Sequence, residues 1–239
     1  MFTQLTAKGE NWLASDMKLK KLFLSMRYYL FKHRKWDRVL ALDTKSMFTE
    51  IYRNNLWNNE ESLSGGGSTL NRTAKIREGL QKLFLDREIE SICDAGCGDF
   101  NWMKTVEFRT IKYIGIDIVA DLISANKKKY EGENISFIDL DIIRDDLPTV
   151  DLIICREVLF HLSFQDVRAA IANFKRSKSR YLLVTHFPYL SENIDVQTGR
   201  CRGIHFQKAP LNFPPPISTI QEDVSDHCLA LWKIADLDP

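Results

Sequence analysis

Glycine and aspartate residues follow successive apolar runs in this 239-residue chain. Gly96 and Gly98 follow the first run, and glycine lets the backbone turn sharply and pass close to a ligand. Asp94 lies in the same turn, Asp117 ends the second run, and Asp141 follows the third. Carboxylates repel a polyphosphate, but they suit a ligand with a ribose, an amino group and a cationic sulfur. The pattern therefore predicts a ligand of the second kind.

Two other nucleotide sites are disfavoured by the same turn. A dinucleotide site of the Gly-x-Gly-x-x-Gly type would have a third glycine where Asn101 stands, so an NAD-dependent oxidoreductase is the weaker alternative. A phosphate-binding loop would need Gly-Lys followed by Ser or Thr, and the sequence has none.

Short β runs alternate with helical patterns from residue 90 onward. Strands are expected at residues 91–94, 111–117, 135–139, 150–155, 181–185 and 228–234. Helices are expected at 70–85, 101–106, 120–130 and 164–175, the first capped by Ser68 or Thr69 and the last by Ser163. Such alternation is typical of a parallel sheet covered by helices on both faces. The proline-rich stretch 189–216 should be irregular.

The N-terminal part has a different pattern, and we expect a helical extension over residues 1–60 and a main domain over 61–239. Basic residues gather between residues 17 and 38 beside an apolar helix face. This segment is either an interfacial helix that makes peripheral contact with anionic lipid or steers an anionic substrate, or an added helix whose charges are simply solvated.

The stretch Ser-Gly-Gly-Gly-Ser-Thr at residues 64–69 separates these parts. It is either a flexible linker or a lid that folds back over the ligand. As a lid, it would bring Ser64, Gly67 and Arg72 or Arg77 to a carboxylate of the ligand.

Composition excludes several classes of protein. The net charge of +1 gives no support for binding nucleic acid. No secretory signal or apolar run long enough for a membrane span is evident, and five scattered cysteines suit a reduced protein, so we expect a cytoplasmic location. Cys93 and Cys97 lack the partners of a metal site, and no metal is expected.

On these residues the chain resembles the class I S-adenosylmethionine-dependent methyltransferases, most closely a group of bacterial stand-alone methyltransferase-domain proteins. Residues 64–68, 94–102 and 155–163 carry the resemblance. It implies a Rossmann-like, doubly wound α/β fold with a mostly parallel seven-stranded sheet, and it implies S-adenosylmethionine as the cofactor. Phe100 stands where the family often has a third glycine, so the turn should be more crowded.

The resemblance also assigns roles by position. Asp94, Gly96, Cys97 and Gly98 would line the methionine end of the cofactor. Asp117, with Ile118 beside it, would take the ribose hydroxyls. Asp141 and the Ile142 backbone would meet the adenine, and Arg156 would border the methyl group together with Glu157.

Methyl transfer mainly requires alignment of the acceptor and exclusion of water, and a base is needed only for some acceptors. Candidate bases are Glu157 and His161 after the fourth strand and His186 after the fifth, with Asp195 and His205 further along. His161 could instead be a packed, hydrogen-bonded residue, and Glu157 could cap a helix or pair with Arg156.

Residues 193–213 lie where this fold commonly builds its acceptor site. Basic and aromatic side chains there suit an anionic or sugar-containing acceptor, or else belong to a structural crossover: Arg200, Arg202, Phe206, Lys208 and Phe213. The expected function is methyl transfer to a small-molecule or glycan acceptor. The alternative is a protein of the same fold that binds the cofactor without catalysis, or docks on a membrane or a partner.

Overall fold

The computed structural model describes residues 36–222 and 226–237. The chain divides into two compact units after Leu42, and residues 36–40, which are helical, belong to the first. Residues 17–35 of the predicted lipid-binding segment lie outside the described residues, and the domain boundary at residue 60 stays a prediction. Within the described residues, no helix is both long and apolar enough to cross a membrane.

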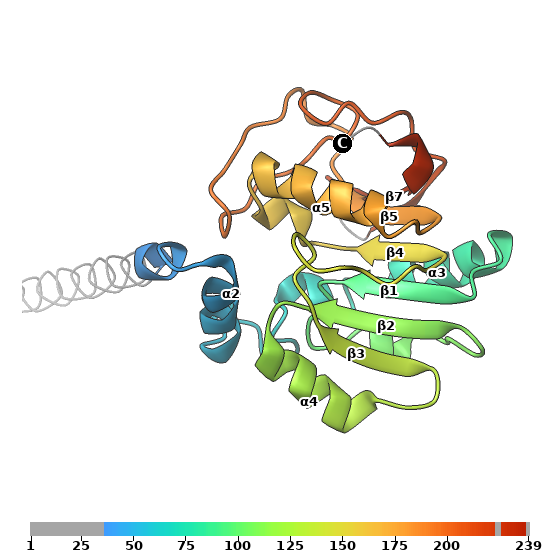
Figure 1. The fold of residues 1–239 in the computed structure, drawn as a ribbon, viewed down its shortest axis with the longest axis horizontal. Helices are drawn as coiled ribbons and strands as arrows, with labels where there is room; N and C mark the ends of the chain where they lie inside the picture. The colour runs from blue at the N-terminus through green and yellow to red at the C-terminus, as the bar shows by residue number, and fades with distance from the viewer. Residues whose placement is uncertain (1–35, 223–225, 238–239) are drawn as a thin grey trace, which may run out of the picture. The chain divides into compact units, whose positions relative to one another are not determined.

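The second unit is built on one sheet, whose strands among the described residues run in the order β3-β2-β1-β4-β5-β7-β6 (Figure 1). The strands are β1 Ser91–Ala95, β2 Lys112–Asp117, β3 Ile135–Asp139, β4 Leu152–Cys155, β5 Tyr181–His186, β6 Ser218–Gln221 and β7 Cys228–Lys233. β1 to β5 pair in parallel, and β7 is antiparallel to β5 and β6. The predicted Rossmann-like, mostly parallel sheet of seven strands is confirmed.

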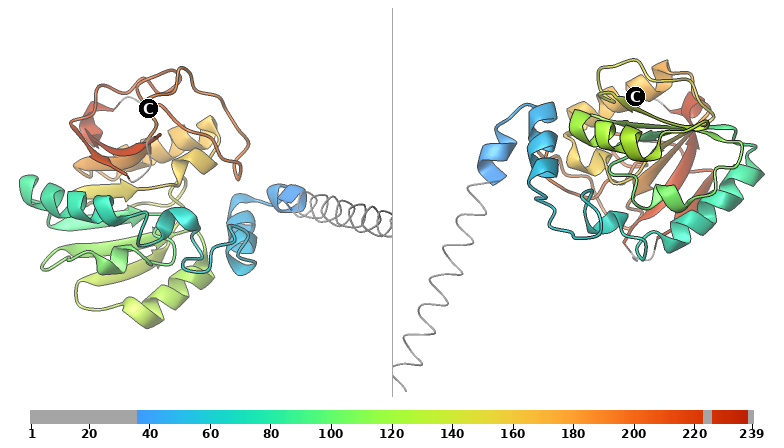
Figure 2. Two further views of the ribbon diagram at one scale, coloured as in Figure 1. Left: turned by 180° about the vertical axis from the view of Figure 1, so that it is seen from behind. Right: turned by 90° about the horizontal axis from the view of Figure 1, so that it is seen from below.

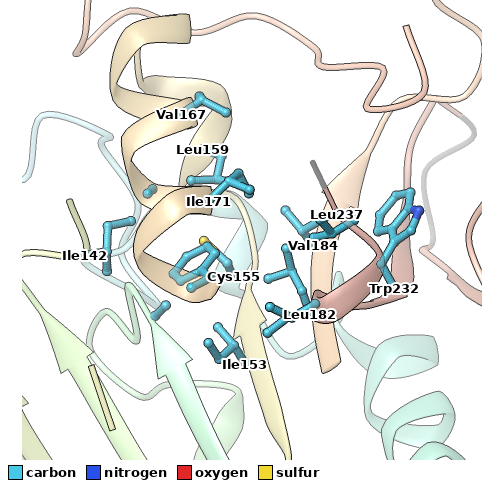
Figure 3. Close-up of a cluster of buried hydrophobic side chains, with 14 of the residues drawn as sticks. Ile142, Ile153, Cys155, Leu159, Val167, Ile171, Leu182, Val184, Trp232 and Leu237 are labelled. Atoms are coloured by element: carbon cyan, nitrogen blue, oxygen red, sulfur yellow. The ribbon is translucent and has the colours of Figure 1, made fainter. Parts of the chain in front are cut away.

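Because successive strand residues point to opposite faces, the buried strands feed two hydrophobic clusters. Helix α5, Phe164–Arg176, covers one face, where Val167 and Ile171 pack among residues such as Ile153 and Leu182 (Figure 3). Helices α3, Ala74–Asp86, and α4, Ala120–Tyr130, contribute to the cluster on the other face, and Figure 2 shows α3 from behind. Both faces are therefore covered, as expected for parallel strands.

A shorter helix, α2, Thr44–Arg53, belongs to the same unit as the sheet. Asp43 caps it by accepting a hydrogen bond from the Ser46 backbone N–H at 3.1 Å. Two ion pairs tie α2 to the edge of the sheet. Lys45 contacts Asp139 at the end of β3 at 2.9 Å, and Arg53 contacts Asp121 in the first turn of α4 at 2.7 Å.

Several sequence expectations need correction. Residues 101–106 hold only a 3-10 turn, Met103–Thr105, which follows Phe100 in a left-handed backbone conformation. Helix α3 begins at Ala74, later than predicted, because residues 66–68 form a separate 3-10 turn, so neither Ser68 nor Thr69 caps it. Strand β6 was not expected. The cap at Ser163 is confirmed by its hydrogen bond from Asp166 N, and residues 189–216 are irregular as predicted.

Candidate functional site

The glycine turn after β1 lies directly against the end of β2. Gly96 N and Cys97 N donate to the Ile116 carbonyl at 2.8 and 3.0 Å, and Gly98 N donates to the Asp117 carboxylate at 3.2 Å. Gly98 has a φ of +54°, and a Cβ added there would lie 2.1 Å from Ser64 Oγ. Only glycine allows the turn and the preceding loop to approach this closely.

That preceding loop, residues 62–68, is folded against the turn and is not a free linker. Asp99 holds it, because its carboxylate accepts hydrogen bonds from Leu63 N at 2.8 Å, Ser62 Oγ at 2.9 Å and Ser64 Oγ at 3.2 Å. Ser64 Oγ in turn accepts from Asp99 N at 2.9 Å. The position of the loop fits the lid alternative.

Asn101, which occupies the place of a third glycine, adds to the same clamp. Its side-chain amide donates to Glu61 at 2.9 Å and to the Ser68 carbonyl at 3.1 Å. Phe100 turns away and is buried among aromatic rings, with ring centroids 5.0 Å from Tyr113 and 5.1 Å from Phe137. The crowding expected from Phe100 is therefore taken up by the hydrophobic cluster behind the turn.

A pocket of about 890 Å³, partly open to solvent, lies at the carboxyl ends of β1 to β4. It is lined from α2, the loop, the turn and the strand ends by Thr44, Phe48, Tyr52, Trp57, Ser64, Ser68, Gly96, Gly98, Asp117, Ile118, Val119, Leu122, Leu140, Asp141, Ile142, Ile143, Arg156, Glu157, Val158, His161 and Leu162. The neighbouring strands β1 and β4 lie where the winding of the sheet reverses, the usual ligand site of this architecture.

Most of the predicted site residues line this pocket, but five do not. Those that line it are Ser64, Gly96, Gly98, Asp117, Ile118, Asp141, Ile142, Arg156, Glu157 and His161. Asp94 and Cys97 are buried, Arg72 is exposed, Gly67 lies against the Glu157 carboxylate, and His186 is buried at the end of β5 beside His205. Their expected direct roles are not supported by this placement.

Burial sets the ionisation of the two aspartates near the turn. It raises the pKa of Asp117 to about 6, against the lowering effect of the hydrogen bonds from Val119 N and Gly98 N. Burial also raises the pKa of Asp94 to about 7, although Tyr113 donates a hydrogen bond to its carboxylate at 2.7 Å. The pocket lining therefore includes one carboxylate whose negative charge is poorly solvated, Asp117, and a second one, Asp94, is buried nearby outside the lining.

An ion-pair network lies behind the β4 end of the pocket. The Arg156 guanidinium bridges two carboxylates, since Nη2 is 3.1 Å from Glu157 Oε1 and 2.7 Å from Glu222 Oε2. His227 Nε2 lies 3.4 Å from Glu222 and 3.9 Å from Glu157, and its Nδ1 is 2.7 Å from Asp226. Glu157, Glu222 and His227 place ligand atoms within 4.8 Å of one another, and Arg156 pairs with both carboxylates of this group.

The network also fixes the ionisation of its buried members. Burial raises the pKa of Glu222, but hydrogen bonding to His227 and the charge of Arg156 outweigh it, so the pKa is lowered. Burial lowers the pKa of His227, but Glu222 and Asp226 outweigh it, so that pKa is raised. Both shifts favour the charged forms, as in a compensated ion-pair cluster.

The histidines after the strands have different surroundings. Burial lowers the pKa of His161 to about 4, so this pocket-lining ring is neutral at pH 7. Its Nδ1 lies 3.3 Å from the Arg200 carbonyl. His186 packs at 4.9 Å from the ring of His205 and accepts from Phe206 N, away from the pocket. Asp195 accepts from Phe164 N and does not line the pocket either.

The basic side chains of residues 193–213 do not reach the pocket. Arg202 donates to the Leu159 and Ile194 carbonyls at 3.1 and 3.3 Å, and Lys208 donates to the Ser191 carbonyl at 2.5 Å. Phe206 and Phe213 are buried in the core. For these residues, the structural-crossover alternative describes the structure better than the acceptor-site alternative.

Sequence reasoning missed the wall that α2 contributes and the network partners Glu222 and His227. Thr44, Phe48 and Tyr52 recur at a spacing of four, so they share one helix face, and that periodicity was the available signal. Nothing local marks Glu222, which lies 66 residues after Arg156.

The fold has counterparts among known proteins. A family model described as a methyltransferase domain matches residues 92–178. Magnesium protoporphyrin IX methyltransferase (ChlM) from Synechocystis PCC 6803 with bound SAM has a TM-score of 0.54 and 14% identity, covering 81% of this chain and 98% of that one. The N-methyltransferase NodS from Bradyrhizobium japonicum WM9 in complex with S-adenosyl-L-homocysteine has a TM-score of 0.52 and 16% identity, covering 84% and 97%. No curated protein matches the sequence.

At these identities the solved structures show the fold, and the methyltransferase-domain match is confined to residues 92–178. The domain match spans β1 to α5, which include the glycine turn and the β4 end of the pocket. The chain therefore contains a methyltransferase domain over residues 92–178, on a fold that it shares with methyltransferases whose structures hold SAM or S-adenosyl-L-homocysteine.

Proposed function

We propose that the pocket binds S-adenosylmethionine across the ends of β1, β2 and β3 and presents its methyl group to a small-molecule or sugar-containing acceptor at the end of β4. One observation carries the proposal. A single pocket is lined by the glycine turn, by Asp117 and Asp141, and by Glu157 beyond them. The groups of the cofactor would follow in the same order. The methionine part would lie at the glycine turn, the ribose at Asp117, the adenine at Asp141 and the methyl group toward Glu157.

The residues present fit that cofactor. Gly98 leaves the turn free of a side chain where Ser64 approaches, and the Asp117 carboxylate is oriented by Gly98 N and Val119 N so that it can accept from ribose hydroxyls. The Asp141 carboxylate is held by Ile143 N at 2.8 Å. It can accept from an adenine amino group. When bound, the cofactor supplies an electrophilic methyl group on a positively charged sulfur.

The chain itself supplies alignment and shielding at the acceptor end. Glu157 and neutral His161 are the groups there that can take a proton, so either fits an acceptor that must lose one. The apolar lining from α2 and the loop clamped by Asp99 exclude water from the line of transfer. A cytoplasmic location and a lipid contact through residues 17–38 stay predictions.

Titration calorimetry with S-adenosylhomocysteine tests the placement of the ribose. Replacing Asp117 with Ala should weaken binding roughly 10- to 100-fold, since a hydrogen bond to a charged group contributes about 1.5–3 kcal/mol. Asp146→Ala is the control, because Asp146 is an exposed aspartate that does not line the pocket. Its affinity should stay near that of the wild type, and equal losses in both variants would place the ribose elsewhere.

A further inference from the structure

Glu157 holds an unusual position at the acceptor end of the pocket. It has a φ of +56°, a left-handed conformation that costs a non-glycine residue about 1–2 kcal/mol. Its backbone N–H is held by Thr185 Oγ1 at 2.8 Å. Strained backbone persists where surrounding contacts enforce it, commonly at functional sites. The hydrogen bond from Glu157 N to Thr185 therefore helps to hold the Glu157 carboxylate at the pocket wall, although the left-handed backbone lowers the stability of the fold.

The loop over the turn leaves room for this carboxylate. A Cβ added to Gly67 would lie 1.8 Å from Glu157 Oε2, so the absence of a side chain at residue 67 lets the two segments meet. The Glu157 side chain is 20% exposed, whereas Glu222 on the far side of Arg156 is 1% exposed. Of the two carboxylates that Arg156 bridges, only Glu157 lines the pocket and can be reached by a ligand.

The charges that line the pocket are mostly negative. Asp117, Asp141 and Glu157 line the pocket with one guanidinium, that of Arg156, which also pairs with buried Glu222. His227, whose pKa is raised, does not line the pocket, but its Nε2 lies 3.9 Å from Glu157 Oε1. The basic residues that had suggested an anionic acceptor, Arg202 and Lys208 among them, bond to backbone carbonyls outside this lining. The described part of the pocket therefore favours a cation and disfavours an anion.

Aromatic rings also line the pocket. Phe48, Tyr52 and Trp57 line the pocket, and the Trp57 ring lies 6.0 Å from that of His161. Aromatic faces bind both apolar groups and cations, through their negative quadrupole. An acceptor with an apolar body and a positively charged nitrogen matches both walls.

We propose that the methyl acceptor is a small amine that enters as its ammonium ion and pairs with Glu157. This inference rests on the proposed function. Glu157 takes one proton from the ammonium group and so frees the nitrogen lone pair. The lone pair forms a bond to the methyl carbon as the carbon–sulfur bond breaks, and the electrons of that bond remain on sulfur. The products are a methylated ammonium ion, a neutral thioether and protonated Glu157, which returns its proton to water.

Three probes with one apolar body test the charge preference: benzylamine, benzyl alcohol and benzoate. Each is titrated into the full-length protein saturated with S-adenosylhomocysteine at pH 7 and followed by ligand-observed NMR. Benzylamine should bind roughly tenfold or more tightly than the other two, the effect of one charge-assisted hydrogen bond. Glu157→Gln should remove that preference. Glu133→Gln, an exposed position outside the pocket, should leave it intact.

Saturation with S-adenosylhomocysteine is measured first, which separates the two levels of the proposal. Failure to bind it would overturn the proposed cofactor site. If it binds in the wild type and in Glu157→Gln, then equal affinity for all three probes, no detectable probe binding, or a preference for benzoate would each overturn the amine inference alone. An unchanged preference in Glu157→Gln would assign the selectivity to another residue and overturn the role of Glu157.

Discussion

Cofactor affinity should depend on pH through Asp117. Burial raises the pKa of this carboxyl to about 6, and its ionised form is the one that accepts from a ribose and attracts a cationic ligand. With that pKa, about 90% of the groups are ionised at pH 7 and about 10% at pH 5. The affinity for S-adenosylmethionine should therefore fall roughly tenfold between pH 7 and pH 5, equivalent to about 1.4 kcal/mol.

Calorimetry in two buffers of different ionisation enthalpy measures both the affinity and the protons released on binding. Near pH 6 the wild type should release protons, because the ligand favours ionised Asp117. Asp117→Asn should bind more weakly at pH 7 and lose most of the pH dependence. A wild-type affinity that is flat from pH 5 to pH 7, or an undiminished slope in the Asn variant, would refute the assignment of this titration to Asp117.

Two further changes test the surroundings of the turn. Because burial raises the pKa of Asp94 to about 7, ionisation of this carboxyl destabilises the folded state as pH rises from about 4 to 7. Asp94→Asn keeps an acceptor for Tyr113, so it should raise the free energy of urea unfolding by roughly 2–4 kcal/mol at pH 8 and by little at pH 4. No gain at pH 8 would contradict this cause. Asp99→Ala removes the acceptor for Leu63 N and Ser64 Oγ. It should lower the free energy of unfolding by about 1–3 kcal/mol and speed hydrogen exchange at the Leu63 amide. Unchanged exchange would show that the loop is held by other contacts.

The sheet and its acidic ends could be predicted because both depend on local patterns. Apolar runs of four to six residues separated by helical periodicity indicate parallel strands, and parallel strands bring their carboxyl ends to one edge. Gly98, Asp117 and Asp141 therefore had to lie close together once the strand order was known. Strand β6, which is short and carries mostly exposed polar residues, gives no such signal. It forms because it pairs with β7 in the antiparallel direction.

The acceptor end of the site could not be predicted in the same way. Arg156 and Glu157 are adjacent in the sequence, but Glu222 and His227 join them only after the chain has passed through β5 and the irregular segment. Arg202 shows the converse error. A basic residue in a loop suggests a ligand, yet two backbone carbonyls accept hydrogen bonds from Nε and Nη1 of Arg202. Composition identifies which groups are available, and only the tertiary contacts decide which of them stay available to a ligand.

Several features in and beside the pocket cost the folded chain free energy. Asp94 and Asp117 are carboxylates with raised pKa values, and Glu157 has a left-handed backbone. None of these features stabilises the folded chain by itself, and each would be removed by a simple substitution. A ligand with a positive charge offsets the cost of the buried carboxylates, because its charge stabilises carboxylates that lost their hydration on folding. The pocket should therefore select cationic ligands, since a neutral or anionic ligand of the same shape would leave the carboxylate charges uncompensated.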